Sequence, residues 1–147
     1  MRVAFSIALL LSNSLVGMAS DIKPTDASTP LFRIYEPKFT SLGSEAQIPK
    51  ANYKEPPLLV IRAVRDLILA ADQKGVMIGL TAADTQKFAQ LTHQFDKRYL
   101  ILIATDSIGE VMHITAPIED GYIGFKYPEA APIAEYLRRR FRIAEFK

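Results

Sequence analysis

The chain contains no cysteine and no tryptophan, and its net charge is only +2, from 18 Lys and Arg against 16 Asp and Glu. The lack of thiols excludes disulfide scaffolds, thiol catalysis and Cys-ligated zinc or iron–sulfur clusters. So small a net charge gives no sign of a nucleic-acid partner. What is present is an ordinary globular composition over 147 positions, with 49% hydrophobic residues. This length and composition predict one folded domain.

Long apolar runs are also lacking, except at the N-terminus. After a short positive start, the stretch 3–11 is almost entirely apolar, and small residues stand at Gly17 and Ala19. This pattern predicts a secretory signal peptide over residues 1–19, cleaved after Ala19. The alternative is a retained membrane anchor, which the polar residues 12–14 at mid-span disfavour. No later segment reaches the ~20 apolar residues of a membrane-spanning helix. We therefore expect a periplasmic or secreted protein without a transmembrane span once the signal is removed.

Residues 20–54 are expected to form a flexible leader, and residues 55–147 the folded domain. The stretch 21–30 is polar and contains two prolines, and 40–57 is rich in turn and loop residues. Between them, the stretch 31–35 is a candidate short strand.

The segment 58–71 fits two patterns equally well. Its apolar spacing suits a helix, whereas residues 66–71 also suit the first strand of a hairpin that returns over 76–80. Beyond it, Thr81 followed three residues later by Asp84 predicts the start of a helix. Apolar residues repeat at helical spacing from there, which predicts that this helix runs to about residue 96.

Three strands and a second helix are predicted after that. The strands cover about 99–105, 110–115 and 122–127, separated by turns that contain glycine. The second helix buries one face, formed by Ala130, Ile133, Leu137 and Phe141. This order predicts an α+β fold, a small antiparallel sheet with two helices packed on one face.

Alternation along the strand 110–115 separates an inner from an outer side. Met112 and Ile114 are predicted to pack beneath the helices, and Val111, His113 and Thr115 to face outward. An open sheet face or an unpaired edge strand accepts an extended peptide by strand addition. The alternative is an edge blunted by charge, from Glu110 or Lys126.

Four short stretches follow one another in a characteristic order between residues 55 and 141. They are Glu55-Pro56-Pro57-Leu58-Leu59, Gly79-Leu80-Thr81 continuing through Phe88 to Leu91-Thr92, the strand-turn-strand from Leu100 to Ile118, and Tyr127 through Glu129-Ala130 to Ile133-Ala134 and Leu137. Together they resemble the head subdomain of the first large periplasmic domain of the SecD/SecDF protein-export family.

The chain departs from that family in three ways. Where the family has a glycine shortly before the aromatic residue that precedes its last helix, this chain has Phe125, with Gly124 one place earlier. Its hairpin after Leu100 is a few residues longer, and the membrane segments that couple proton flow to export in the family are missing. The resemblance therefore implies the fold and a non-enzymatic surface that contacts polypeptide or another envelope protein. It does not imply translocase activity.

Catalytic and cofactor motifs are absent from the sequence, so we expect no enzyme and no cofactor. The rival interpretation is a small hydrolytic enzyme whose site gathers Asp106, Glu119, Asp120 and His113 from distant positions. His93 and Asp96 lie three residues apart on a predicted helix, but a metal site needs further donors, so a surface histidine is favoured.

The most polarised feature is an arginine cluster near the C-terminus, formed by Arg138, Arg139, Arg140 and Arg142. One interpretation is a contact with an anionic partner or an anionic membrane surface. The other is a solvated rim whose cations stabilise the C-terminal end of a helix. A third possibility for the whole protein is a structural accessory domain that associates with the translocation machinery at the membrane surface.

Overall fold

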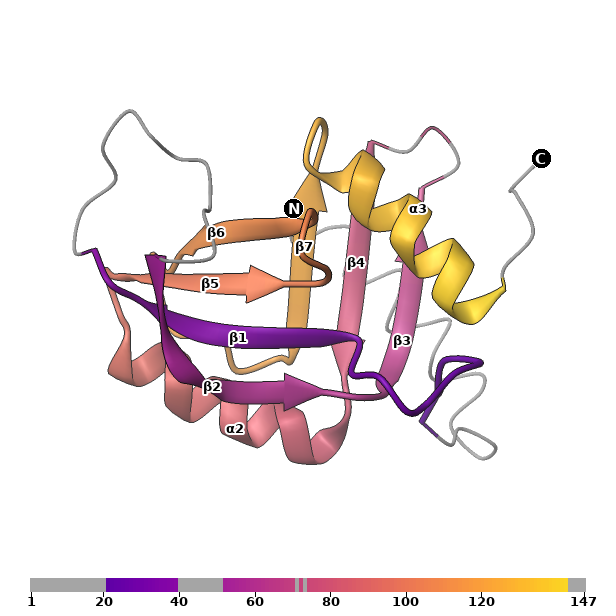
Figure 1. Cartoon of the computed structure of the whole chain (residues 1–147). Helices are drawn as coiled ribbons and strands as arrows, with labels where there is room; N and C mark the ends of the chain where they lie inside the picture. The colour runs from indigo at the N-terminus through magenta and orange to yellow at the C-terminus, as the bar shows by residue number, and fades with distance from the viewer. Residues whose placement is uncertain (1–20, 40–51, 71, 73, 143–147) are drawn as a thin grey trace.

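The computed structural model describes residues 21–39, 52–70, 72 and 74–142 (Figure 1). The predicted signal peptide lies outside these residues. In chain order the elements are β1 (Phe32–Pro37), β2 (Tyr53–Ile61), β3 (Val64–Leu69), β4 (Gly75–Leu80), α2 (Ala82–Gln94), β5 (Tyr99–Ile103), β6 (Gly109–His113), β7 (Tyr122–Lys126) and α3 (Ala130–Phe141). The predicted α+β class is confirmed.

The strands divide between two antiparallel sheets, where the sequence predicted one. A four-stranded sheet has the order β2-β1-β5-β6, and a three-stranded sheet has the order β3-β4-β7. The two sheets run at a steep angle to each other in Figure 1. The chain first passes from one sheet to the other between β2 and β3, which are separated by only two residues. β2 pairs with β1, whereas β3 pairs with β4.

Each helix packs mainly against its own sheet. Thr81 caps α2, because its hydroxyl accepts a hydrogen bond from the backbone N–H of Asp84 at 3.2 Å, as the capping pattern predicted. α2 packs against β2, and α3 packs against the central strand β4 of the other sheet. The two helices therefore do not share one face of a single sheet.

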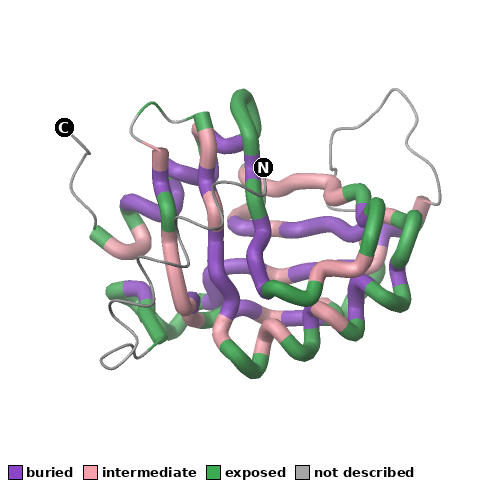
Figure 2. Tube along the Cα trace, turned by 180° about the vertical axis from the view of Figure 1, so that it is seen from behind, coloured by how far each residue is buried: buried purple, intermediate pink, exposed green. Residues whose placement is uncertain are grey.

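One continuous core joins the two sheets and the two helices. Phe88 and Leu91 of α2 and Ile133 and Leu137 of α3 all belong to it, with at most 8% of any of them exposed. The strand predicted from residue 99 is covered on both faces, since Leu100, Ile101 and Leu102 are fully buried. Figure 2 shows the resulting contrast between buried central strands and more exposed margins.

Of the two interpretations of residues 58–71, the hairpin is confirmed for Val64–Leu69, whereas residues 58–61 form the end of β2 in the other sheet. β3 pairs with β4 in continuous register from Asp66 to Leu69. The predicted loop over 40–57 is wrong at its end, because β2 already begins at Tyr53. Pro56 and Pro57 are tolerated because both lie where the register between β1 and β2 shifts, between the pairs Ile34–Leu59 and Glu36–Lys54, so neither has to donate to the ladder. Residues 40–51 lie outside the described part.

The fold begins well before residue 55. β1 lies between β2 and β5, so the candidate short strand is central to the larger sheet. Upstream of it, Ile22 and Val64 form an antiparallel bridge by exchanging two backbone hydrogen bonds of 2.6 and 2.9 Å. Residues 21–31, predicted to be flexible, are thus attached to the folded body.

Candidate functional site

β6 is one of the two outer strands of the four-stranded sheet, opposite β2. The side of β6 that faces away from β5 carries unpaired backbone groups. The Ala104 N–H donates to the Ile108 carbonyl, and the Ile114 N–H donates to the Arg98 carbonyl, each at 2.8 Å. Hydrogen-bonded residues alternate along an antiparallel strand, so positions 108, 110, 112 and 114 bond to β5. The N–H and C=O groups of Gly109, Val111 and His113 therefore point away from the sheet, and no strand in the described part of the chain pairs with them.

The edge of β6 is less protected than the other outer strands, because its only charged residue is Glu110 on the inner side. β2 has two prolines and a break in its register with β1. The start of β3 is bridged by Ile22, and β7 ends in Lys126. β6 has neither proline nor lysine and keeps an unbroken register with β5. An edge of this kind is a template for pairing with another chain.

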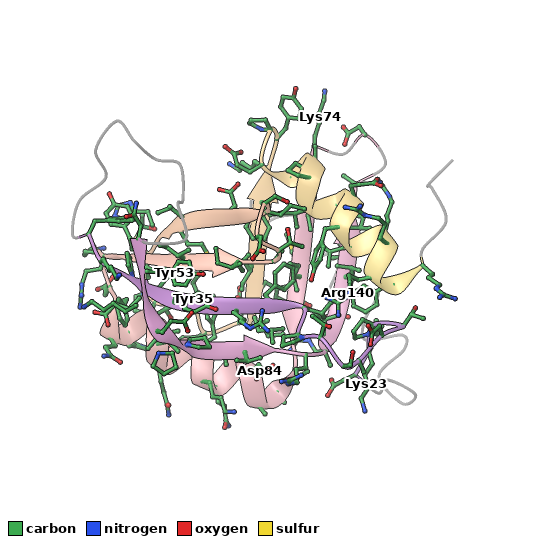
Figure 3. All side chains as sticks on the ribbon, viewed as in Figure 1. Lys23, Tyr35, Tyr53, Lys74, Asp84 and Arg140 are labelled. Carbon is green, nitrogen blue, oxygen red and sulfur yellow. The ribbon has the colours of Figure 1, made fainter. Side chains whose placement is uncertain are left out.

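The outer face of the sheet continues from β6 as two rows of side chains. His113 stacks on the ring of Tyr99 of β5, with 4.7 Å between ring centroids. Val111 lies opposite Ile101, which lies opposite Tyr35. Tyr35 in turn packs on Tyr53 at a centroid distance of 4.1 Å, as Figure 3 places them on adjacent strands. The predicted orientation is confirmed, since His113 and Thr115 are exposed and Ile114 is buried.

A small open pocket lies at one end of this sheet. It is lined by Glu36, Pro37, Lys38, Phe39, Lys54, Arg98 and Tyr99. The Glu36 carboxylate lies 3.2 Å from the Lys54 ammonium and 3.6 Å from the Arg98 guanidinium. The side chains of Lys54 and Arg98 are more than half exposed, so the ion pairs add little to stability.

Glu110 is the acidic group on the inner side of β6. Burial raises the pKa of its carboxyl, and the nearby negative charge of Glu129, at the start of α3, raises it further. The charged form of Glu110 is therefore disfavoured in the folded protein.

Replacing Glu110 with glutamine should stabilise the protein at neutral pH. The folded state holds the Glu110 proton more tightly than the unfolded state, so ionised Glu110 costs stability above its raised pKa. This loss of stability disappears as the pH falls from above the raised pKa of folded Glu110 to the ordinary glutamate pKa of 4.5. Urea unfolding of Glu110→Gln and wild type should show a gain at pH 7 that shrinks towards pH 4. A gain of equal size at both pH values would contradict this assignment.

The structure separates the four arginines of the predicted cluster. Arg139 and Arg142 are exposed, whereas Arg138 is only 7% exposed and its Nε has no hydrogen-bond partner among the described residues. Arg142 adopts a left-handed conformation that ends α3. Only Arg139 and Arg142 are therefore placed to meet an anionic surface, and that contact stays a prediction.

Arg140 binds the N-terminal segment (Figure 3). Its Nη2 donates to the carbonyls of Thr29 at 2.6 Å and Asp26 at 3.1 Å, and its Nη1 donates to the carbonyl of Pro30 at 3.0 Å. Nη1 also donates to the Tyr136 hydroxyl, which donates to the carbonyl of Leu31, each at 2.6 Å. No local pattern indicates this role, because the three backbone acceptors lie more than 100 positions away.

The residues of the rival enzymatic interpretation are not gathered into one place. Asp106 lies in the turn before β6, and His113 lies at the far end of that strand. Glu119 lies 2.9 Å from His93 of α2, and Asp120 accepts a hydrogen bond from the backbone N–H of Tyr122. No group of three potential metal ligands occurs among the described residues. His93 is thus in contact with Glu119, and Asp96 lies 3.9 Å from the Lys97 ammonium.

No helix in the described ranges is long and apolar enough to span a membrane.

No family model matches the chain, and no curated protein matches it. Solved structures do match. The crystal structure of SecDF in a super-membrane-facing form aligns with a TM-score of 0.56 at 18% identity, over 80% of this chain and 20% of that one. A structure of SecDF, described as a membrane component that enhances protein export, aligns with a TM-score of 0.52 at 18% identity, over 92% of this chain and 70% of that one.

The chain thus spans about one fifth of the length of the first of these structures. The alignments cover more of this chain than the segment 55–141 that carries the sequence motifs. At 18% identity such a likeness concerns the fold. The resemblance to the SecD/SecDF family expected from the sequence is confirmed at that level.

Proposed function

We propose that the protein is an exported, non-enzymatic interaction module that binds an extended segment of polypeptide as an added strand beside β6. The observation that carries the proposal is the unpaired edge formed by Gly109, Val111 and His113. Their outward N–H and C=O groups offer main-chain hydrogen bonds to any extended segment, which is the basis of recognition by strand addition.

The side chains next to this edge define which segments fit it. On the outer face Val111 lies beside the row formed by His113 and Tyr99, and its own row continues to Ile101, which is fully buried. An added strand places alternate side chains next to these rows. Segments with β-branched or aromatic residues at alternate positions are therefore the expected ligands.

Export and a protein partner are supported by two further features. Residues 1–19 have the pattern of a signal peptide. The fold is shared with SecDF, whose description names protein export. Recovery of the protein in the periplasmic or extracellular fraction, processed after Ala19, would support the first of these.

A proline at position 111 tests the binding mode directly. The Val111 N–H points away from β5, so Val111→Pro removes an edge donor without breaking the β5–β6 ladder. The probe is a fluorescent peptide with valine or tyrosine alternating with threonine or lysine. We expect Val111→Pro to weaken binding about tenfold or more, because hydrogen bonds at the edge are lost and the ring obstructs the approach. Fluorescence anisotropy measures the affinity.

Two controls separate edge pairing from other binding. Val111→Thr keeps the backbone N–H and the β-branched shape, so its affinity should stay close to that of the wild type. A probe methylated on alternate backbone nitrogens lacks the donors that face β6 and should not bind. Binding of the probe by Val111→Pro at wild-type affinity, together with binding of the methylated probe as tight as that of the unmethylated one, would refute pairing at this edge.

A further inference from the structure

The free edge of β6 is complementary to itself. Its outward backbone groups belong to three residues spaced two apart, Gly109, Val111 and His113. When two copies run antiparallel about a two-fold axis at Val111, Val111 faces Val111 of the second copy and Gly109 faces His113. Each such pair exchanges two hydrogen bonds. This is the register in which all three outward residues of both copies are paired, since any slip of two residues leaves one of them without a partner.

The side chains also fit in this register. On the outer face, His113 meets Gly109 of the other copy, which has no side chain that would displace the ring from Tyr99. Val111 extends the apolar row of Ile101 across the axis. On the inner face, Glu110 lies opposite Met112, so the two Glu110 residues are diagonal neighbours, with Cα atoms about 7–8 Å apart, instead of directly opposed.

We infer that the partner that fits this edge is a second copy of the chain, and that two copies join their β6 strands into one eight-stranded sheet. The inference rests on the proposed function, because it uses the same edge, and it adds the identity of the partner. Homodimers with a two-fold axis use the same patch on both subunits, as this register does. An interface of five residues per strand is small, so we expect the dimer to be weak and to form at high protein concentration.

Single cysteines test the register, because the natural chain contains none. In the variant Val111→Cys the two introduced side chains face each other across the axis, at a separation that a disulfide can bridge. In Thr115→Cys, on the same outer side, they lie about 25 Å apart along the strands. Oxidation of the concentrated protein should therefore crosslink the first variant at least tenfold faster than the second. Analytical ultracentrifugation should show association of wild-type protein between micromolar and near-millimolar concentration, and Val111→Pro should reduce it at least tenfold.

The outcomes separate the dimer from the proposed function. A wild-type protein that stays monomeric at near-millimolar concentration, or equal crosslinking of both cysteine variants, would overturn the dimer. If Val111→Pro still abolishes binding of the peptide probe in that case, the proposed function stands. If the peptide does not bind wild type but the dimer forms in the stated register, the edge pairs only with itself and peptide binding is overturned.

Discussion

Replacing Gly121 with alanine should lower the free energy of unfolding by about 2–5 kcal/mol. Gly121 has φ of +76°, which costs an L-residue with a side chain about 1–2 kcal/mol. A Cβ at this position would collide with the Thr85 hydroxyl oxygen and lie 2.9 Å from the Thr85 methyl. Overpacking of this kind costs about 1–3 kcal/mol. Urea unfolding followed by circular dichroism measures the loss.

The same chain provides a matched control for Gly121. Gly124 lies three residues later in β7, is exposed, and a Cβ there would meet only the Val76 carbonyl oxygen at 3.9 Å. Gly124→Ala should therefore change stability by no more than about 0.5 kcal/mol. The double variant Gly121→Ala with Thr85→Ala should recover the part due to the collision but not the part due to φ. A Gly121→Ala variant as stable as Gly124→Ala would contradict the close approach of this turn to α2.

Replacing Arg140 with alanine should cost about 2–4 kcal/mol and release the N-terminal segment. The guanidinium donates to three backbone carbonyls and to the Tyr136 hydroxyl, so four acceptors lose their partner together. Hydrogen bonds to charged groups contribute about 1.5–3 kcal/mol each, and partial exposure of Arg140 lowers the total. Amide hydrogen exchange should show loss of protection at Ile22 and Thr25, whose N–H groups bond to the folded body.

Arg139 serves as the control for Arg140 because it is its exposed neighbour. Arg139→Ala should leave both stability and exchange of residues 22–31 unchanged. Arg140→Lys should retain the charge but lose most of the stability, since an ammonium cannot reach all the acceptors that the planar guanidinium reaches. If Arg139→Ala and Arg140→Ala behave alike, the arginines form a solvated rim and the hydrogen bonds to the N-terminal segment contribute nothing.

These two sites lie away from β6, which makes them useful for the functional tests. Gly121 approaches α2, and Arg140 lies at the end of α3 beside the N-terminal segment. A mild destabilisation at either site should not alter peptide affinity under conditions where the protein stays folded. Loss of binding only in edge variants such as Val111→Pro would then be attributable to the edge itself.

Local patterns in the sequence determined the individual elements. Thr81 and Asp84 start α2 as expected, because capping depends on residues three positions apart. Alternation along β6 correctly separated His113 from Ile114, since neighbouring side chains of a strand point to opposite faces. The α+β class and the resemblance to SecDF followed from the order of these elements.

The tertiary structure decided how those elements pair and which side chains stay free. Strand order cannot be read from alternation, so the division into two sheets, the central place of β1 and the open edge at β6 emerged only from the fold. The roles of the arginines were also decided by tertiary contacts. Arg138 and Arg140 look equivalent in the sequence, yet Arg138 is buried and Arg140 donates to carbonyls more than 100 positions away. Short-range spacing fixes the local conformation of a chain, whereas pairing between distant segments depends on which arrangement buries the most apolar surface and leaves the fewest backbone groups unpaired.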